Sequence, residues 1–416
     1  MKKILDFFSN HPYFVSLMFI LGWWSFAFHT PPTSPPFPLL TSVSAPQLPT
    51  LSHLERFSLQ KALLGDFDLM LQFIKNWNTD ASVLERSGVK AIKKLSTKKL
   101  LQAHDLYHLI HQSSPQNLKH LNRMLATKHL VDGSEALVEI PDLVSSLLPQ
   151  TYMAATFLLA IADPQEILAI PRGMRELTQL YPSPLLDLIP KNIQYYQGEK
   201  LYLASPSLAF ISLYSHPPSL EAMRRQGIPF FVLSTPNNLT DIFKALRQVG
   251  HASQHVLEAR LLHIFMEAAF LMIDNRLQTL HSKADHLPLQ MLLYLYCEES
   301  SYKIPTLKSL SGQLLQRALH HNPSFISPWL SETDFNWRLP FEQEKIRQTA
   351  PDCLILAHRQ SKPSLNVDYF QGIPACEKQK LFYIDETVQE SPTQFIVLAY
   401  FDLFQILATA QGMSQP

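Results

Sequence analysis

The chain has 416 residues, 46% of them apolar and 17% charged, which provides for a large core and two or three domains and excludes a disordered tail protein. Thirty-five basic and thirty-five acidic residues leave no net charge, so a basic nucleic-acid-binding protein is not expected. Only 11 glycines occur, and neither the dinucleotide-binding nor the P-loop fingerprint is found, which disfavours nucleotide chemistry.

The N-terminal segment has the pattern of an export signal. Lys2 and Lys3 precede an apolar run over residues 13–28, which is shorter than the roughly 20 residues that span a bilayer. Ser25 and Ala27 supply the small residues of a signal-peptidase site, so the segment is a cleaved signal peptide or a short inner-membrane anchor, and a buried helix is a third interpretation. No cysteine lies near the run, so a bacterial lipoprotein is not expected.

The next part of the chain is predicted to be helical and the remainder α/β. Apolar residues three and four apart over 51–131 predict a small helical module, and beyond Asp132 short apolar runs alternate with helical segments, as in parallel sheets. Residues 253–280 contain neither Gly nor Pro, which predicts one helix of roughly 40 Å after a shorter helix that begins at Leu239. The predicted strands are 136–140, 166–170, 208–213, 230–233, 291–296, 353–357 and 381–384, and the other helices are 152–162, 219–226, 310–319, 342–349 and 393–410.

These elements predict an α/β fold of two parallel-sheet lobes joined by one long helix, preceded by an all-helical module and an N-terminal apolar segment. The predicted segments are 1–28 (signal peptide or anchor), 29–50 (proline-rich linker), 51–131 (helical module), 132–237 (lobe 1), 238–284 (joining helices) and 285–416 (lobe 2).

Several residue patterns have both a functional and a structural interpretation. Cys297, Cys353 and Cys376 allow at most one disulfide and lack the spacing of a zinc site. His104, His108 and His111 lie on one predicted helix face, where they could share a metal ion or form a solvated surface. No nucleophile-elbow or zinc-protease motif is found in a suitable context, so an enzyme is not expected.

Six segments resemble, in the same order, the helical-backbone (class III) periplasmic solute-binding proteins of ABC importers for iron-siderophores, haem, cobalamin and metals. The longest is SLEAMRRQGIPFFVLSTPNNLTDIFKALRQVG, which resembles the end of the first lobe and the entry to the joining helix. The others are ALVEIPDLVSSLL, SPSLAFISL, LSGQLLQRAL, IRQTAPDCLILAH and YIDETVQESPTQFIVLAYFDL. Together they cover residues 136–410.

The resemblance implies a substrate-binding component that holds its ligand in a cleft between two lobes, beyond the carboxyl ends of the strands. Histidine, tyrosine and carboxylate side chains there could ligate a metal or haem iron, and Arg172 and Arg359 could clamp anionic oxygens. No resident cofactor is expected. The residues implied to bind ligand are Asp142, Arg172, Tyr214 and His216 from the first lobe, and Glu298, Tyr302, His358, Arg359 and Asp385 from the second.

The resemblance also implies an ABC permease partner, but the docking positions differ from the family pattern. Acidic residues are usual on top of each lobe, whereas this chain has Pro217 and Pro218 in one lobe and Gln313 in the other. Docking through two salt bridges is therefore in doubt. The alternative is an envelope protein that uses the same scaffold to bind a protein partner without transport.

Overall fold

A computed structural model describes residues 50–86, 95–177, 179–189, 191–193, 199–215, 217–284, 288–298, 301–330, 336–359 and 370–412. All of them belong to one unit, Pro46–Pro416. The expected export segment and most of the expected linker lie outside the described residues. Within the described part, none of the helices is long and apolar enough to cross a bilayer.

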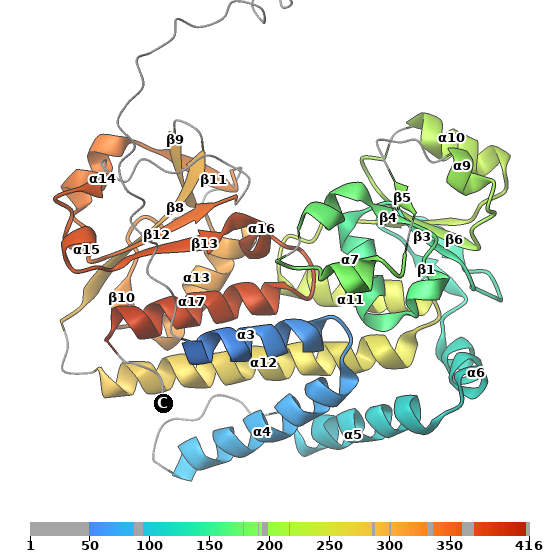
Figure 1. Cartoon of the computed structure of the whole chain (residues 1–416), viewed down its shortest axis with the longest axis horizontal. Helices are drawn as coiled ribbons and strands as arrows, with labels where there is room; N and C mark the ends of the chain where they lie inside the picture. Colours follow the sequence, from blue (N-terminus) through green and yellow to red (C-terminus); the bar gives the residue numbers. More distant parts are fainter. Residues whose placement is uncertain are drawn as a thin grey trace, which may run out of the picture. The chain divides into compact units, whose positions relative to one another are not determined.

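Within the described residues, four helices precede the first strand, as the periodicity predicted (Figure 1). Local capping explains where two of them begin: Ser96 Oγ accepts from the backbone N–H of Lys99, and Ser114 Oγ accepts from that of Asn117. The helices are α3 (Thr50–Leu63), α4 (Phe67–Arg86), α5 (Thr97–Gln112) and α6 (Pro115–Leu125).

Lobe 1 contains a three-stranded parallel sheet in the order β3-β6-β7. A second, two-stranded parallel pair, β4 with β5, lies outside this sheet. The strands are β3 (Leu147–Pro149), β4 (Ile170–Pro171), β5 (Asn192–Ile193), β6 (Leu208–Ser212) and β7 (Phe230–Leu233), and the helices are α7 (Tyr152–Ile161), η1 (Pro164–Glu166), η2 (Arg172–Glu176), α8 (Ser183–Leu186), α9 (Glu199–Tyr202), α10 (Pro217–Arg225) and α11 (Leu239–Ala252).

The first strand of this sheet differs from the prediction. Residues 137–139 form β2 (Leu137–Glu139), which pairs antiparallel with β1 (His129–Val131) in a separate hairpin, and the parallel sheet begins at β3. The two hairpin strands are exposed or half-buried, whereas all three residues of β3 are buried, as is usual for strands of a parallel sheet that is covered on both faces. The predicted strand 166–170 is formed only in part: Glu166 ends η1, Ile167 makes an isolated parallel bridge with Leu147, and regular strand pairing begins at Ile170.

The long helix α12 (Val256–Lys283) contacts α4, α5, α11, α13 and α17. Its 28 residues span about 42 Å, which confirms the long helix predicted over residues 253–280. The turn from α11 into α12 needs a glycine, because a Cβ at Gly250 would lie 2.4 Å from the Ala259 Cβ.

Lobe 2 contains a mixed sheet in the order β11-β9-β8-β12-β13, with β10 beside β8 (Figure 1). Strands β8, β12 and β13 are parallel and confirm the predicted strands, whereas β9 and β11 add an antiparallel extension that was not predicted. The strands are β8 (Gln290–Glu298), β9 (Ser301–Pro305), β10 (Phe325–Ile326), β11 (Arg338–Phe341), β12 (Cys353–His358) and β13 (Leu381–Asp385), and the helices are α13 (Leu310–His321), α14 (Gln343–Thr349), α15 (Pro374–Glu377), α16 (Glu386–Gln389) and α17 (Ile396–Ala410).

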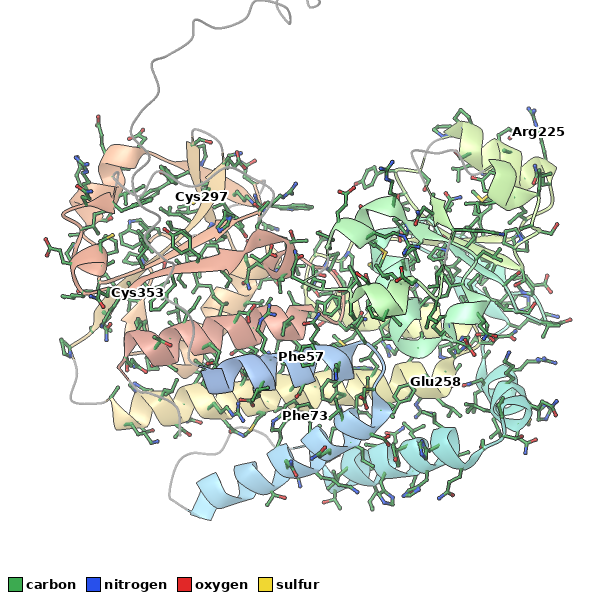
Figure 2. All side chains as sticks on the ribbon, in the orientation of Figure 1. Phe57, Phe73, Arg225, Glu258, Cys297 and Cys353 are labelled. Carbon is green, nitrogen blue, oxygen red and sulfur yellow. The ribbon has the colours of Figure 1, made fainter. Side chains whose placement is uncertain are left out.

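One continuous apolar core connects the N-terminal helices with both lobes along α12 (Figure 2). Leu59, Ile74 and Ala103 from the N-terminal helices are buried in the same cluster as Phe157 of lobe 1 and Tyr400 of α17. The main sheet of each lobe also has a smaller apolar cluster of buried side chains, separate from this shared core.

Candidate functional site

The three parallel strands of lobe 2 end side by side in polar residues. Strand β8 ends at Glu298, β12 at His358 and β13 at Asp385, and the sheet register pairs His358 with Asp385. The sequence prediction placed these side chains at the carboxyl edge of the sheet, and the structure brings them there together. This edge is where open α/β sheets bind ligands.

An ion-pair network covers this edge, and its central member, Arg338, was not predicted. The Arg338 guanidinium lies 3.6 Å from the centroid of the Tyr296 ring, 3.0 Å from Glu386 and 3.7 Å from Glu298. The Arg359 Nε lies 3.6 Å from the same Glu386 carboxylate. Glu386 is therefore held between two guanidinium groups, and the Arg359 guanidinium already has a carboxylate partner within the protein.

A buried hydrogen-bond network lies next to this cluster. The Tyr296 hydroxyl bonds both Ser311 and Glu390, and the Ser311 Oγ donates to Glu390 Oε1 at 2.6 Å. Burial raises the pKa of Tyr296 well above its ordinary value, and the neighbouring Tyr294 and Glu390 add to this effect. Tyr296 therefore remains a neutral hydrogen-bond donor under the π-stacked Arg338.

Tyr302 and His358 make contacts within the lobe. The Tyr302 ring meets Phe370 edge to face, with centroids 5.6 Å apart, and packs on an apolar cluster of lobe 2. His358 Nδ1 lies 3.2 Å from the carbonyl oxygen of Arg359, and its ring stands edge-on to Tyr383. Both residues thus have structural partners as well as a position near the strand ends.

In lobe 1 the structure exposes two of the predicted residues. Tyr214 follows β6, and 82% of it is accessible in a turn that closes when the backbone N–H of Ser212 donates to Ser215 Oγ. Arg172 begins η2 directly after β4 and is also exposed. The third residue, His216, lies outside the described residues.

The prediction that Asp142 lies at the carboxyl edge of the lobe 1 sheet is wrong. It follows the antiparallel hairpin strand β2 and precedes the amino end of β3, so it does not belong to the carboxyl edge of the parallel sheet. Its side chain is 88% exposed and pairs with Lys128 at 3.3 Å.

Several side-chain contacts join the lobes directly, and two of them involve residues that the sequence singled out. The Gln179 amide of lobe 1 donates to Asp385 Oδ2 at 2.9 Å, while Asp385 Oδ1 accepts from the backbone N–H of Thr387. Gln313, at the expected permease-docking position of lobe 2, donates to the carbonyl oxygen of Asn237 at 2.7 Å. Asp385 and Gln313 therefore stabilise the pairing of the lobes.

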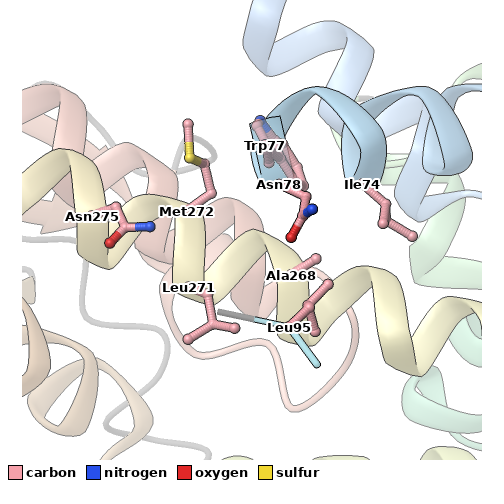
Figure 3. A pocket seen from close by; sticks show the side chains of 8 residues that line it. All are labelled: Ile74, Trp77, Asn78, Leu95, Ala268, Leu271, Met272 and Asn275. Carbon is pink, nitrogen blue, oxygen red and sulfur yellow. The ribbon is translucent and has the colours of Figure 1, made fainter. Parts of the chain in front are cut away.

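A small pocket lies between α4 and α12. It has about 20 Å³ of space, enough for a single water molecule (Figure 3). Trp77 on its wall stacks with Phe265 at 5.5 Å. Among the described residues there is no group of three or more His, Cys, Asp and Glu side chains arranged to hold a metal ion. The pocket is lined by Ile74, Trp77, Asn78, Leu95, Ala268, Leu271, Met272 and Asn275.

The cysteines are free thiols. Cys297 and Cys353 are buried and Cys376 is half-buried, and burial raises the pKa of each of the first two to about 12. The Cys297 and Cys353 thiols are therefore protonated and unreactive at neutral pH.

Comparison with known proteins identifies the fold. No protein-family model matches the sequence, and no curated protein matches it. Among solved structures, the molybdate periplasmic binding protein MolA of a Haemophilus influenzae ABC transporter superposes with a TM-score of 0.51 at 12% identity, over 68% of this chain and 92% of that one. A periplasmic heme-binding protein from Pseudomonas aeruginosa gives a TM-score of 0.50 at 11% identity, over 66% of this chain and 95% of that one. The chain is thus a mixed α/β protein with the fold of periplasmic binding proteins, as the resemblance implied.

Proposed function

We propose that the protein is the substrate-binding component of an ABC importer, exported to the periplasm, and that it captures an iron chelate, haem, cobalamin or a metal ion between its lobes. The observation that carries the proposal is the set of charged and aromatic side chains at the carboxyl edge of lobe 2, beside the contact of Asp385 with lobe 1. The fold shared with periplasmic binding proteins supports it. The N-terminal apolar segment would direct export and, if retained, anchor the protein in the inner membrane without a lipid.

Within this proposal, Arg359 is the residue best placed to exchange partners. Its side chain is 62% exposed, and its 3.6 Å contact with Glu386 is loose compared with the 3.0 Å contact that Arg338 makes to the same carboxylate. Arg359 could therefore leave Glu386 for a carboxylate or catecholate of the ligand, while Arg338 keeps Glu386 paired. The proposed ligand-binding residues are Arg172, Tyr214, His216, Glu298, His358 and Arg359, together with Arg338.

Thermal unfolding with a ligand panel tests the proposed function. A ligand that binds only the folded chain raises the unfolding midpoint by mass action. Haem, ferric siderophores, cobalamin and divalent metals are each added in excess to the purified protein. A rise of several degrees with one compound supports the proposal and identifies the cargo. If the protein is well folded and none of the compounds raises its unfolding midpoint, the proposal is contradicted.

The site assignment has its own test. Replacing Tyr214 and Arg359 together by alanine should weaken binding of the compound identified in the panel by about 100-fold, because an aromatic and a cationic contact are both lost. Both side chains are largely exposed, so the unfolding midpoint should stay within about 2 °C of the wild type. Arg225→Ala is the matched control, since Arg225 is 77% exposed and forms a surface ion pair with Glu221 on the same helix. Unchanged affinity in the double variant would remove the assignment and leave the fold intact.

A second candidate function is partner binding in the cell envelope without transport. Gln313 supports it, because this residue stands where an acidic side chain is usual for docking on a permease, and its amide donates to the carbonyl oxygen of Asn237 in the other lobe. This function would be favoured by two results together. None of the ligands raises the unfolding midpoint, and crosslinking in the native cells joins the chain to an envelope protein. Crosslinking to a permease would favour the first.

A further inference from the structure

A pair of histidines on α5 lies outside the proposed cleft and has a geometry of its own. His104 and His108 are one helical turn apart, and their Nε2 atoms are 3.1 Å from each other. His104 is exposed and His108 half-exposed, whereas Ala103 and Leu106 on the same helix are buried. The two imidazoles therefore converge at the surface through the same type of ring nitrogen.

This separation fits two ligands of one metal ion. Imidazole nitrogens bind zinc at about 2.0–2.1 Å, so two of them on one ion lie about 2.9 Å apart at a right angle and about 3.4 Å apart at a tetrahedral angle. The observed 3.1 Å falls between these limits. Without a metal, the same contact is a hydrogen bond in which one ring donates and the other accepts.

A neighbouring amide can fix the required tautomer. The side-chain amide nitrogen of Gln112, one further turn along α5, lies 3.1 Å from Nδ1 of His108 and donates to it. Ligation through Nε2 requires the hydrogen to be on Nδ1, and a turn of the Gln112 amide would present its oxygen to that N–H. Gln112 is therefore a positioning residue for the His108 ring.

His111, the third histidine predicted on this face of α5, contacts other residues. His111 stacks on the Tyr107 ring, with centroids 5.3 Å apart and an interplanar angle of 12°. The Tyr107 hydroxyl in turn donates to Asp68 of α4, which ties this pair to the neighbouring helix. The Tyr107 ring also meets His108 edge to face, with centroids 5.4 Å apart, so His111 stacks on Tyr107 while His104 and His108 contact each other directly.

We propose that His104 and His108 form a surface binding site for a divalent transition-metal ion, with water completing the coordination. Two imidazoles favour Cu²⁺ over Ni²⁺ and Zn²⁺ and give no affinity for Mg²⁺ or Ca²⁺, which require oxygen ligands. Binding requires neutral imidazoles, so acidification releases the metal. The site is independent of the proposed cleft and would exist whether or not the protein serves an importer.

Isothermal titration of the purified chain, without a polyhistidine tag, with CuCl₂, NiCl₂ and ZnCl₂ tests the site. One ion should bind per chain, most tightly for Cu²⁺, and His104→Ala or His108→Ala should weaken Cu²⁺ binding by about ten-fold or more. His111→Ala is the matched control and should bind as the wild type does. Gln112→Ala should weaken binding less than either histidine variant does. Wild-type Cu²⁺ binding no tighter than that of the double variant His104→Ala/His108→Ala overturns the proposal, as does an equal loss in His111→Ala.

The same variants separate this site from the cleft. If a divalent metal raises the unfolding midpoint of the wild type but not of His108→Ala, that shift belongs to α5 and gives no support to metal cargo. A shift that persists in His108→Ala assigns the metal elsewhere and leaves the cleft proposal standing.

Discussion

Glu166 is a buried carboxylate at which three parts of the chain meet. One oxygen lies 2.6 Å from Lys119 Nζ of α6, and the other lies 2.9 Å from Nε2 of His255, the residue before α12. Burial of Glu166 opposes ionisation, but the contacts with His255 and Lys119 outweigh it and lower the pKa to about 2. For His255, burial favours the neutral ring, but the contacts with Glu166 and Glu258 raise the pKa. A charged pair therefore fixes the start of α12 to lobe 1.

Replacing Glu166 by glutamine should lower the free energy of unfolding by about 3 kcal/mol near pH 5.5, because a largely buried charge loses its partner. The lowered carboxyl pKa contributes stability above its ordinary value of 4.5 and loses it as the pH falls toward about 2. The raised histidine pKa contributes stability below its ordinary value of 6.5 and loses it as the pH rises through the folded value. Urea unfolding from pH 3 to pH 9 should thus show the largest difference from the wild type between about pH 4.5 and 6.5.

The matched control for this prediction is Glu139→Gln. Glu139 is 64% exposed and pairs with Lys128 at 3.3 Å, so its replacement should leave the unfolding midpoint unchanged. A difference between Glu166→Gln and the wild type that does not vary with pH would show that the charge pair is not its cause.

At the scale of elements, one carboxylate fixes three helices against one another. Asp274 of α12 is fully buried, and its Oδ1 accepts from Arg317 Nε of α13 at 2.9 Å and from the Tyr400 hydroxyl of α17 at 2.7 Å. The Arg317 guanidinium also lies 5.2 Å from the centroid of the Phe270 ring. Burial and the Asp274 charge raise the pKa of Tyr400 well above its ordinary value, so the hydroxyl remains a donor.

Asp274→Ala should lower the free energy of unfolding by about 4 kcal/mol, because Arg317 is left without its buried partner. Replacing both partners, as Asp274→Ala with Arg317→Met, should cost less than Asp274→Ala alone, since no unpaired charge remains. Chemical unfolding of the wild type, both single variants and the double variant completes the cycle. Additive effects of the two single changes would contradict this account.

Elements with a strong local pattern were predictable from the sequence. The long helix α12 and the closing helix α17 are apolar and lack breakers, and the buried run of β7 was predicted with its observed bounds. Strand β3 was missed because only three residues pair and Ser145 and Ser146 precede them, so that its pattern resembles a loop.

The same reasoning explains which site residues were found. The ends of β8, β12 and β13 were visible because an apolar run stops at each of them. Arg338 was missed because it reaches the site through the pairing of β11 with β9, and no local signal marks a strand that begins more than thirty residues after its partner. Asp142 was misplaced because the apolar residues of 136–140 have the pattern of a buried first strand, whereas they form the antiparallel hairpin strand β2.

At the scale of the whole molecule, α3 is bonded to both lobes, and its Glu55 lies 2.6 Å from Arg276 of α12. Arg56 donates two bonds to Asp402 of α17, at 2.7 and 3.0 Å. One turn later, the Gln60 amide donates to the carbonyl oxygens of Gln179 and Leu180 in lobe 1, at 2.8 and 2.9 Å. Together with the continuous helix α12, these bonds should limit closure of the lobes to a small movement.

The N-terminal helices are therefore expected to be part of the folding unit. A chain of residues 132–416 would expose the apolar side chains that face Leu59, Ile74 and Ala103, each of which is at most 2% accessible in the structure. Each large buried side chain contributes about 1.5–3 kcal/mol, and several such losses exceed the stability of a typical domain. Residues 46–416 should unfold in one transition, coincident by circular dichroism and tryptophan fluorescence, whereas residues 132–416 should aggregate or lack a cooperative transition. If the chain 132–416 is monomeric and unfolds in one sharp transition, the two lobes fold without the N-terminal helices. The contacts of α3 would then not be needed for the stability of the lobes.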